Sequence, residues 1–225
     1  MLRTPATVGL ISLTLAIGGC SGTTHDAAPQ APAVKPDGLD ALLLKAPEID
    51  TIMGTNGIAP QPVSSDMNDH RDLVNNLNCL GIWQTDEAAV YENSGSNGVR
   101  RQTLRAPDVD LWDSVVVQSV LSFPSSDAAH NFYTQSLDRW SKCTNHRLNV
   151  GISGQSAPGW QSGDLTKADT TITMPVTRQS VDQVRQCERV LSVKANVIID
   201  AEACKPSAVT QAGEIVNRIA AKIPS

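Results

Sequence analysis

The segment from Cys187 to Cys204, CERVLSVKANVIIDAEAC, constrains the fold of this chain more than any other. Two strand-like halves flank the dipeptide Ala195-Asn196, a pattern typical of a β-hairpin. A two-residue turn at this dipeptide places Cys187 directly opposite Cys204, within reach of a disulfide. A three-residue turn would instead leave the two cysteines diagonal. We expect the shorter turn, and with it a disulfide across the hairpin.

The same register sets Arg189 against Glu202, an opposite-charge pair that stabilises neighbouring strands. Apart from Cys20, the other cysteines are Cys79 and Cys143, which by elimination form the second expected disulfide. The cysteines lack the paired C-x-x-C spacing that is typical of structural zinc sites. We therefore expect two disulfides and no metal site.

The amino-terminal segment is typical of an exported lipoprotein. A single cation, Arg3, is followed by an uncharged segment that ends in LAIGGC, with Cys20 last. This ending resembles a bacterial lipobox, which predicts a signal peptide over residues 1–19 and a lipid anchor on Cys20. The alternative is an ordinary secretory signal with an incidental cysteine. A membrane-spanning helix is not expected, because the apolar run is far shorter than the ~20 residues needed to cross a bilayer.

The rest of the chain divides into a tether and one domain. Residues 20–38 are rich in Pro, Ala, Ser and Thr, which predicts a lipidated cysteine followed by a disordered tether. Residues 39–225 are long enough for one domain with a sizeable core. The formal net charge is −5 and no cluster of Lys or Arg is present, so nucleic acid is not an expected partner.

Apolar periodicity and turn residues predict mixed helices and strands in this domain. Pro47 and Gly54 suit the start and the end of a short helix, while Thr85, Ser125 and Ser207 suit the caps of three others. The expected helices are 47–53, 86–91, 125–143 and 207–223. The expected strands are 98–105, 114–123, 159–166, 169–176, 186–194 and 197–203, with an irregular strand within 56–78.

The sequence contains no specific catalytic motif. It lacks a G-x-S-x-G elbow, a phosphate-binding G-x-x-x-x-G-K-[ST] loop and an H-E-x-x-H zinc motif. His70 follows Asp66 and Asp69 and could bind a cation with them, but a solvated loop is the preferred interpretation. We expect no catalytic residue and no cofactor.

Trp112 and Trp160 are the candidates for ligand contact. Both are large, scarce side chains next to loops, where they could line a groove for an apolar or sugar-like ligand. The simpler alternative is packing at a sheet edge. Trp140 lies on the apolar face of the long helix and is expected in the core.

Several segments, in their order, resemble the PknH-like extracellular sensor domain of a mycobacterial receptor kinase and of free-standing mycobacterial lipoproteins. They are LLLKAPEIDTIMG at 42–54, CLGIWQTDEAAVY at 79–91, VVVQSVLSFPSSDAAHNFYTQSLDRWSKC at 115–143 and CERVLSVKANVIIDAEAC at 187–204, followed by the terminal helix. The resemblance covers about residues 40–224. It implies an α+β domain with helices packed on an antiparallel sheet, the two disulfides given above, and a ligand cleft. We expect about five strands.

These features predict a lipid-anchored protein on the extracytoplasmic side of the cell membrane. Its sensor-like domain is expected to bind an unidentified envelope ligand or protein partner in a cleft, without catalysis. Two alternatives stay open. One is an envelope hydrolase with an unrecognised site, and the other is a scaffold protein whose surface binds another protein.

Overall fold

The computed structural model describes residues 32–74, 76–151, 159–180, 183–207 and 209–224, which belong to one compact unit. The predicted signal peptide, the predicted lipid anchor Cys20 and the tether up to residue 31 lie outside the described residues. Within the last part of the predicted tether, a 3-10 helix begins: η1 spans Pro36–Leu42 and buries Leu39 and Leu42. No helix of the described residues is long and apolar enough to cross a membrane.

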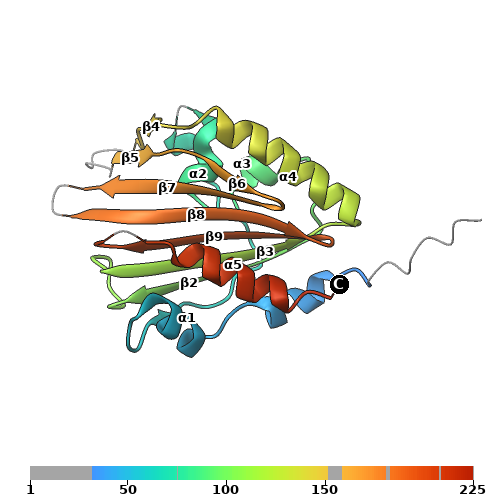
Figure 1. Cartoon of the computed structure of the whole chain (residues 1–225), viewed down its shortest axis with the longest axis horizontal. Coiled ribbons are helices and arrows are strands. Elements are labelled where there is room, and N and C mark those ends of the chain that lie inside the picture. The colour runs from blue at the N-terminus through green and yellow to red at the C-terminus, as the bar shows by residue number, and fades with distance from the viewer. Residues whose placement is uncertain (1–31, 75, 152–158, 181–182, 208, 225) are drawn as a thin grey trace, which may run out of the picture. The chain divides into compact units, whose positions relative to one another are not determined.

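A single antiparallel sheet forms the centre of this unit (Figure 1). Its strands follow the spatial order β1-β2-β3-β9-β8-β7-β5-β4, and β6 pairs with β7 off this path. The strands are β1 Ala59–Pro60, β2 Gly98–Ala106, β3 Ser114–Ser122, β4 Arg147–Leu148, β5 Gly159–Ser162, β6 Thr166–Ala168, β7 Thr171–Gln179, β8 Val184–Lys194 and β9 Val197–Lys205.

Within the described residues the sheet has nine strands, and the expectation of about five was too low. β1 and β4 contain two residues each, which is too short for any periodicity to mark them. The expected strand 159–166 is divided into β5 and the start of β6. The α+β class and the antiparallel arrangement were predicted correctly.

The hairpin β8–β9 has the expected two-residue turn. Cys187 pairs with Cys204 and Arg189 pairs with Glu202 in the ladder. Ala195 in the turn has a left-handed backbone with φ 49°. The structure contains both expected disulfides, Cys187–Cys204 across the hairpin and Cys79–Cys143, with Cα–Cα distances of 4.0 and 5.7 Å.

The helices agree with the predicted caps in two places and differ in two. Gly54 ends α1 with a left-handed φ of 65°, and the Ser125 hydroxyl accepts the N–H of Ala128 at the start of α4. The prediction for Thr85 was wrong, because Glu87 precedes the helix α3 and Thr85 instead donates to the Asp86 carboxylate. The prediction for Ser207 was also wrong, because α5 begins only at Gln211 and its N-cap residue is Thr210. The helices are α1 Ala46–Met53, η2 Arg71–Leu73, η3 Leu77–Cys79, α2 Leu80–Trp83, α3 Ala88–Tyr91, α4 Ser126–Ser141 and α5 Gln211–Ala221.

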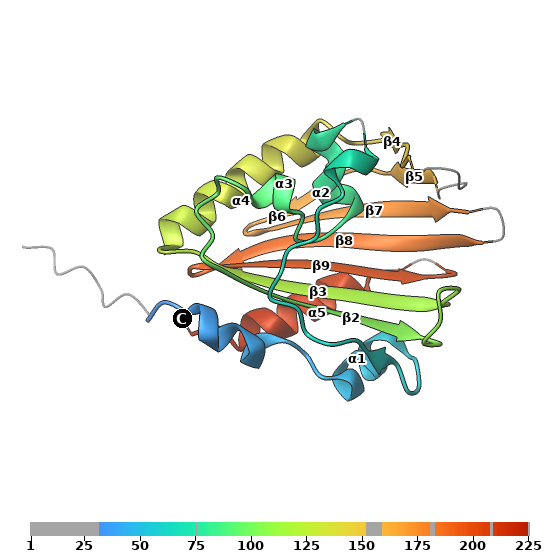
Figure 2. The same ribbon diagram turned by 180° about the vertical axis from the view of Figure 1, so that it is seen from behind.

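Helices cover both faces of the sheet. Helix α5 crosses the face seen in Figure 1, whereas α2, α3 and α4 lie over the opposite face, seen in Figure 2. We call these the α5 face and the α4 face. The α5 face packs its side chains against η1, α1 and α5; its sheet residues include Leu104, Val116, Val120, Val190, Ile199, Ala201 and Ala203. The α4 face includes Leu121, Ile172, Met174, Leu191, Val193 and Ile198.

Candidate functional site

Strand β9 places its acidic residues on one face only. Ile199, Ala201 and Ala203 belong to the apolar core of the α5 face, so the alternating residues Asp200 and Glu202 point to the α4 face. Both are buried, with exposed fractions of 2% and 6%. Burying an acidic side chain costs free energy unless it is paired, so the two acids of β9 make the α4 face the first place to look for a functional site.

Arg189 of β8 lies between these two acids and is completely buried. Its Nη2 donates to Asp200 Oδ1 at 2.7 Å and to the backbone oxygens of Gly81 and Gln84 at 2.8 and 3.2 Å. The guanidinium also lies 5.5 Å from the ring centre of Trp140. Arg189 thereby ties the sheet to the end of α2 and to α4.

Asp200 extends the network to α3. Its Oδ2 accepts the N–H of Asp86 and the hydroxyl of Tyr91, each at 3.0 Å. Burial, followed by the nearby Asp200 charge, raises the pKa of Tyr91 well above its ordinary value. The tyrosine therefore stays a neutral donor.

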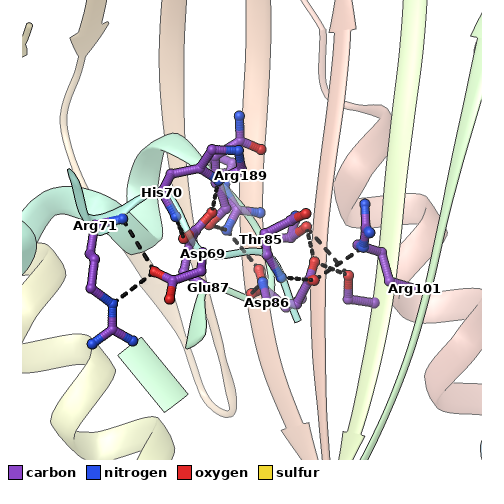
Figure 3. Close-up of polar contacts among 12 residues, drawn as sticks. Asp69, His70, Arg71, Thr85, Asp86, Glu87, Arg101 and Arg189 are labelled. Atoms are coloured by element: carbon purple, nitrogen blue, oxygen red, sulfur yellow. Dashed lines mark hydrogen bonds and ion pairs between the residues drawn. The ribbon is translucent and has the colours of Figure 1, made fainter. Parts of the chain in front are cut away.

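Asp86 carries the network across to β2 (Figure 3). Its carboxylate accepts hydroxyl protons from Thr85 at 2.5 Å and from Ser119 at 2.8 Å, and its Oδ2 lies 3.2 Å from Arg101 Nε. Burial raises the pKa of Asp86, while the two hydroxyls and Arg101 oppose that rise. Asp86 has a left-handed φ of 44°, which turns the chain so that its N–H faces Asp200.

His70 pairs with a buried glutamate and not with the aspartates beside it. Its Nδ1 lies 2.5 Å from Glu87 Oε1 and its backbone N–H donates to Glu87 Oε2, as Figure 3 shows. This hydrogen bond raises the pKa of His70, against the effect of burial. Asp69 pairs instead with Arg71 at 2.8 Å, so the cation site considered for Asp66, Asp69 and His70 is not assembled.

Beside this network lies a pocket on the α4 face, with a volume of about 330 Å³. We call it the Trp112–Trp160 pocket. The structure brings both predicted aromatic residues to it: Trp112 comes from the β2–β3 connection and Trp160 from β5. The lining residues are Trp83, Gln84, Thr103, Trp112, Val115, Val117, Val150, Trp160, Arg178 and Glu202.

Arg178 of β7 joins the two indoles. Its guanidinium carbon lies 5.2 Å from the ring centre of Trp112 and 5.8 Å from that of Trp160. Such contacts hold a cation by the negative face of the ring. The Trp112 backbone oxygen in turn accepts from Arg185 Nη2 at 3.0 Å, which fixes the β2–β3 connection to β8.

Glu202 contributes a carboxyl group that is short of partners. Its nearest cationic atom is Arg189 Nε at 3.6 Å, beyond an ordinary hydrogen bond. The sulfur of Cys204, 3.1 Å away, belongs to a disulfide and has no proton to donate. Burial raises the pKa of Glu202 to about 7, although the Arg189 charge opposes the rise. Among the described residues, no N–H or O–H group donates to this carboxyl within hydrogen-bond distance.

The described residues offer no metal centre. The one group of potential ligands that lies close together is Cys187, Glu202 and Cys204, and both of its cysteines are in the disulfide. Without thiolates, the group retains a single carboxylate, which is too few ligands for a protein metal site.

Comparison with known proteins identifies the family. The pattern of the PknH-like extracellular domain matches residues 34–222. The chain belongs to this family. It is 29% identical over 185 residues to the serine/threonine-protein kinases PknH of Mycobacterium bovis and Mycobacterium tuberculosis. The match covers 82% of this chain but only 29–30% of those kinases.

A solved structure supports the same relationship. The crystal structure of the extracellular domain of PknH from Mycobacterium tuberculosis superposes with a TM-score of 0.79 at 28% identity. The match covers 85% of this chain and 97% of that one. The relatives therefore match through an extracellular domain and not through a kinase catalytic domain. The family suggests an extracytoplasmic location for this PknH-like domain.

Sequence reasoning found the two tryptophans of the pocket but missed its charged residues. Arg178 gave no signal, because it lies beyond the expected strand 169–176, in the part of β7 that the sequence did not predict. Glu202 was assigned only a cross-strand pair with Arg189. The alternation in VIIDAEAC, with apolar residues on one face and two acids on the other, is the signal that marks this site.

Proposed function

We propose that this chain is a cell-envelope lipoprotein whose PknH-like domain binds a small ligand in the Trp112–Trp160 pocket without converting it. The observation that carries the proposal is the pocket itself. It combines aromatic faces with polar groups that have few partners, which is the usual composition of a small-molecule site. Its volume of about 330 Å³ falls at the lower end of such sites.

The polar groups of the pocket support binding more directly than its shape does. No described residue accepts a hydrogen bond from the Arg178 guanidinium, whose contacts are the two indole faces. Glu202 likewise has no donor within hydrogen-bond distance among the described residues. A ligand that accepts from Arg178 and donates to Glu202 would give hydrogen-bond partners to a half-buried cation and a buried acid at once.

Co-purification tests this proposal. The full-length protein, extracted from cell envelopes in mild detergent, is analysed by native mass spectrometry beside a Trp112→Ala/Trp160→Ala variant. We expect a small molecule that is retained by the wild type and lost from the variant. Absence of any bound molecule, or equal retention by both proteins, would contradict the proposal.

The lipid anchor is tested separately on Cys20. Labelling cells with an alkyne-tagged fatty acid should mark the wild-type protein and not a Cys20→Ala variant. We also expect the wild type to partition with membranes and the variant to remain free of them. An unlabelled wild-type protein would leave the alternative of an ordinary signal peptide.

One observation favours the hydrolase alternative. A carboxyl group whose pKa is about 7 is well suited to act as a general base near neutral pH, and Glu202 has this property in a pocket. However, Glu202 is the only acid that lines the described pocket, and no cysteine or serine lines it. Turnover in an activity screen that Glu202→Gln abolishes would favour catalysis over binding.

A further inference from the structure

Above the pKa of Glu202, which is about 7, the Trp112–Trp160 pocket contains one charge of each sign. Of the described residues that line it, only Arg178 and Glu202 are ionisable side chains of opposite charge, and the others are aromatic, aliphatic or neutral polar. They lie on β7 and β9, and burial lowers the pKa of Arg178 while the Glu202 charge opposes that fall. A ligand in this pocket meets both a cation and an acid.

This charge balance discriminates between ligand classes. An anion would be attracted by Arg178 but repelled by Glu202. A cation would be attracted by Glu202 but repelled by Arg178, whose guanidinium lies against the two indole rings. A purely apolar ligand would bury both polar groups without partners, which is unfavourable for each of them.

A hydroxylated ring satisfies every group in the pocket. Its hydroxyl groups can donate to the Glu202 carboxylate and accept from the Arg178 guanidinium. Its C–H faces suit the indoles of Trp112 and Trp160 and the nearby side chains of Val115 and Val117. The volume of about 330 Å³ leaves room for one or two such rings.

We propose that the Trp112–Trp160 pocket binds a neutral saccharide of one or two rings, with its hydroxyl groups bridging Arg178 and Glu202. This inference rests on the proposed function, because it names the ligand class of the same pocket. It assigns separate roles to the residues: the tryptophans provide the stacking surface, and Arg178 and Glu202, which form no ion pair with each other among the described residues, select hydroxyl groups over charged groups.

Saturation-transfer NMR on the full-length protein in detergent tests the ligand class. The probes are glucose, galactose, mannose, arabinose, maltose and trehalose. For the sugar that binds best, the affinity is then compared with its uronic acid and its 2-amino analogue. We expect the neutral sugar to bind at least about tenfold more tightly than either charged analogue. Equal or tighter binding of a charged analogue would overturn the assignment of a neutral ligand.

Matched substitutions test the residues. Arg178→Gln and Glu202→Gln remove the two charges, while Arg100→Gln and Glu188→Gln are controls that lie on other parts of the sheet. Arg100 pairs with Asp40, and Glu188 accepts the Gly213 N–H. Hydrogen bonds to charged groups contribute about 1.5–3 kcal/mol, so we expect each pocket variant to bind the sugar about 10- to 100-fold more weakly. The controls should bind as the wild type does.

The outcomes separate this inference from the proposed function. If no neutral sugar binds but an envelope molecule co-purifies in a Trp112- and Trp160-dependent manner, the pocket is a ligand site and the saccharide assignment is wrong. If neither is observed, both proposals fail. If a sugar binds but the control variants lose it equally, binding lies outside this pocket and the inference is overturned. Circular dichroism of each variant shows whether it has folded.

Discussion

The two faces of the central sheet are both buried, but different interactions hold them. On the α5 face, β9 contributes Ile199, Ala201 and Ala203 to an apolar core with helix α5. On the α4 face, the same strand contributes Asp200 and Glu202, and β8 adds Arg189. One strand thus supplies an apolar core on one side and a charged network on the other.

The difference indicates a division of labour between the faces. Apolar burial stabilises the α5 face without directional requirements. On the α4 face, the hydrogen bonds of Arg189, Asp200 and Arg185 are directional, and they hold α2, α3 and the β2–β3 connection at defined positions around the pocket. Replacing buried ion pairs by apolar residues is often neutral or stabilising, so stability alone does not account for this network.

The largest expected effect comes from removing the cation of the α4 face. Arg189→Met leaves Asp200 and Glu202 buried without their shared counter-charge, which should lower the free energy of unfolding by about 3–5 kcal/mol. Urea unfolding at pH 7.5 measures it. Arg100→Met is the matched control, because Arg100 pairs with an exposed Asp40 and such surface pairs contribute about 0–1 kcal/mol. Equal losses for both variants would show that the buried network of Arg189 contributes no more to stability than a surface ion pair does.

A cavity in the α5 face should affect stability alone. Ile215 of α5 is fully buried in the apolar core, so Ile215→Ala should lower the free energy of unfolding by about 2–5 kcal/mol. Because this side chain lies on the opposite face from the pocket, sugar binding by the folded fraction should stay unchanged. A variant of normal stability with weakened binding would contradict the division between the faces.

The sequence predicted the long helix α4 and the β8–β9 hairpin better than it predicted the site. Periodicity and turn chemistry are local, so they placed α4, the β8–β9 register and the residues opposite each other within it. The partners of Asp86 and Glu87 come from distant segments. Thr85 therefore looked like a helix cap, although its hydroxyl donates to the carboxylate of the next residue, Asp86, which the distant residues Asp200 and Ser119 hold in place.

The pocket shows the same limit. Trp112 and Trp160 stood out because tryptophan is rare in this chain, but 48 positions separate them and only the sheet brings them to Arg178. His70 was read with Asp66 and Asp69, its sequence neighbours, whereas the fold pairs it with Glu87. Sequence proximity thus suggested the wrong carboxylates. The Glu87 carboxyl group reaches His70 only in the folded chain, where the backbone at Asn68 pairs with that at Glu87.

Glu202→Gln should stabilise the protein at neutral and alkaline pH. The carboxyl has a pKa of about 7 in the folded chain and an ordinary glutamate value when unfolded, so folding favours its protonated form. The contribution of Glu202 to the stability of the wild type is therefore most favourable below pH 4 to 5. It is lost as the pH rises from there to about 7. The total corresponds to about 3 kcal/mol.

Urea unfolding of the wild type and Glu202→Gln at pH 5, 6, 7 and 8 checks this prediction. The other titrating groups are common to both proteins, so their contributions cancel in the difference. We expect the difference in favour of the variant to grow between pH 5 and 7 and then to level off. A variant that is less stable than the wild type at pH 8 would show that the ion pair with Arg189 outweighs the burial of Glu202.

The smallest expected effect concerns His70, at the edge of the α4 face. Its pKa is raised first by the hydrogen bond to Glu87, and also by the charges of Glu87, Asp69 and Asp86. The stabilisation by the protonated imidazole is thus fully present below the unfolded pKa of about 6.5 and is lost as the pH rises through the higher folded value. His70→Gln should lower the free energy of unfolding by about 1–3 kcal/mol at pH 5.5 and by less at pH 8.5.

Comparing His70→Gln, Glu87→Gln and the double variant by urea unfolding at both pH values isolates the coupling between the two side chains. A coupling that is independent of pH would mean that a neutral imidazole suffices, and that the charge on His70 contributes nothing to its interaction with Glu87.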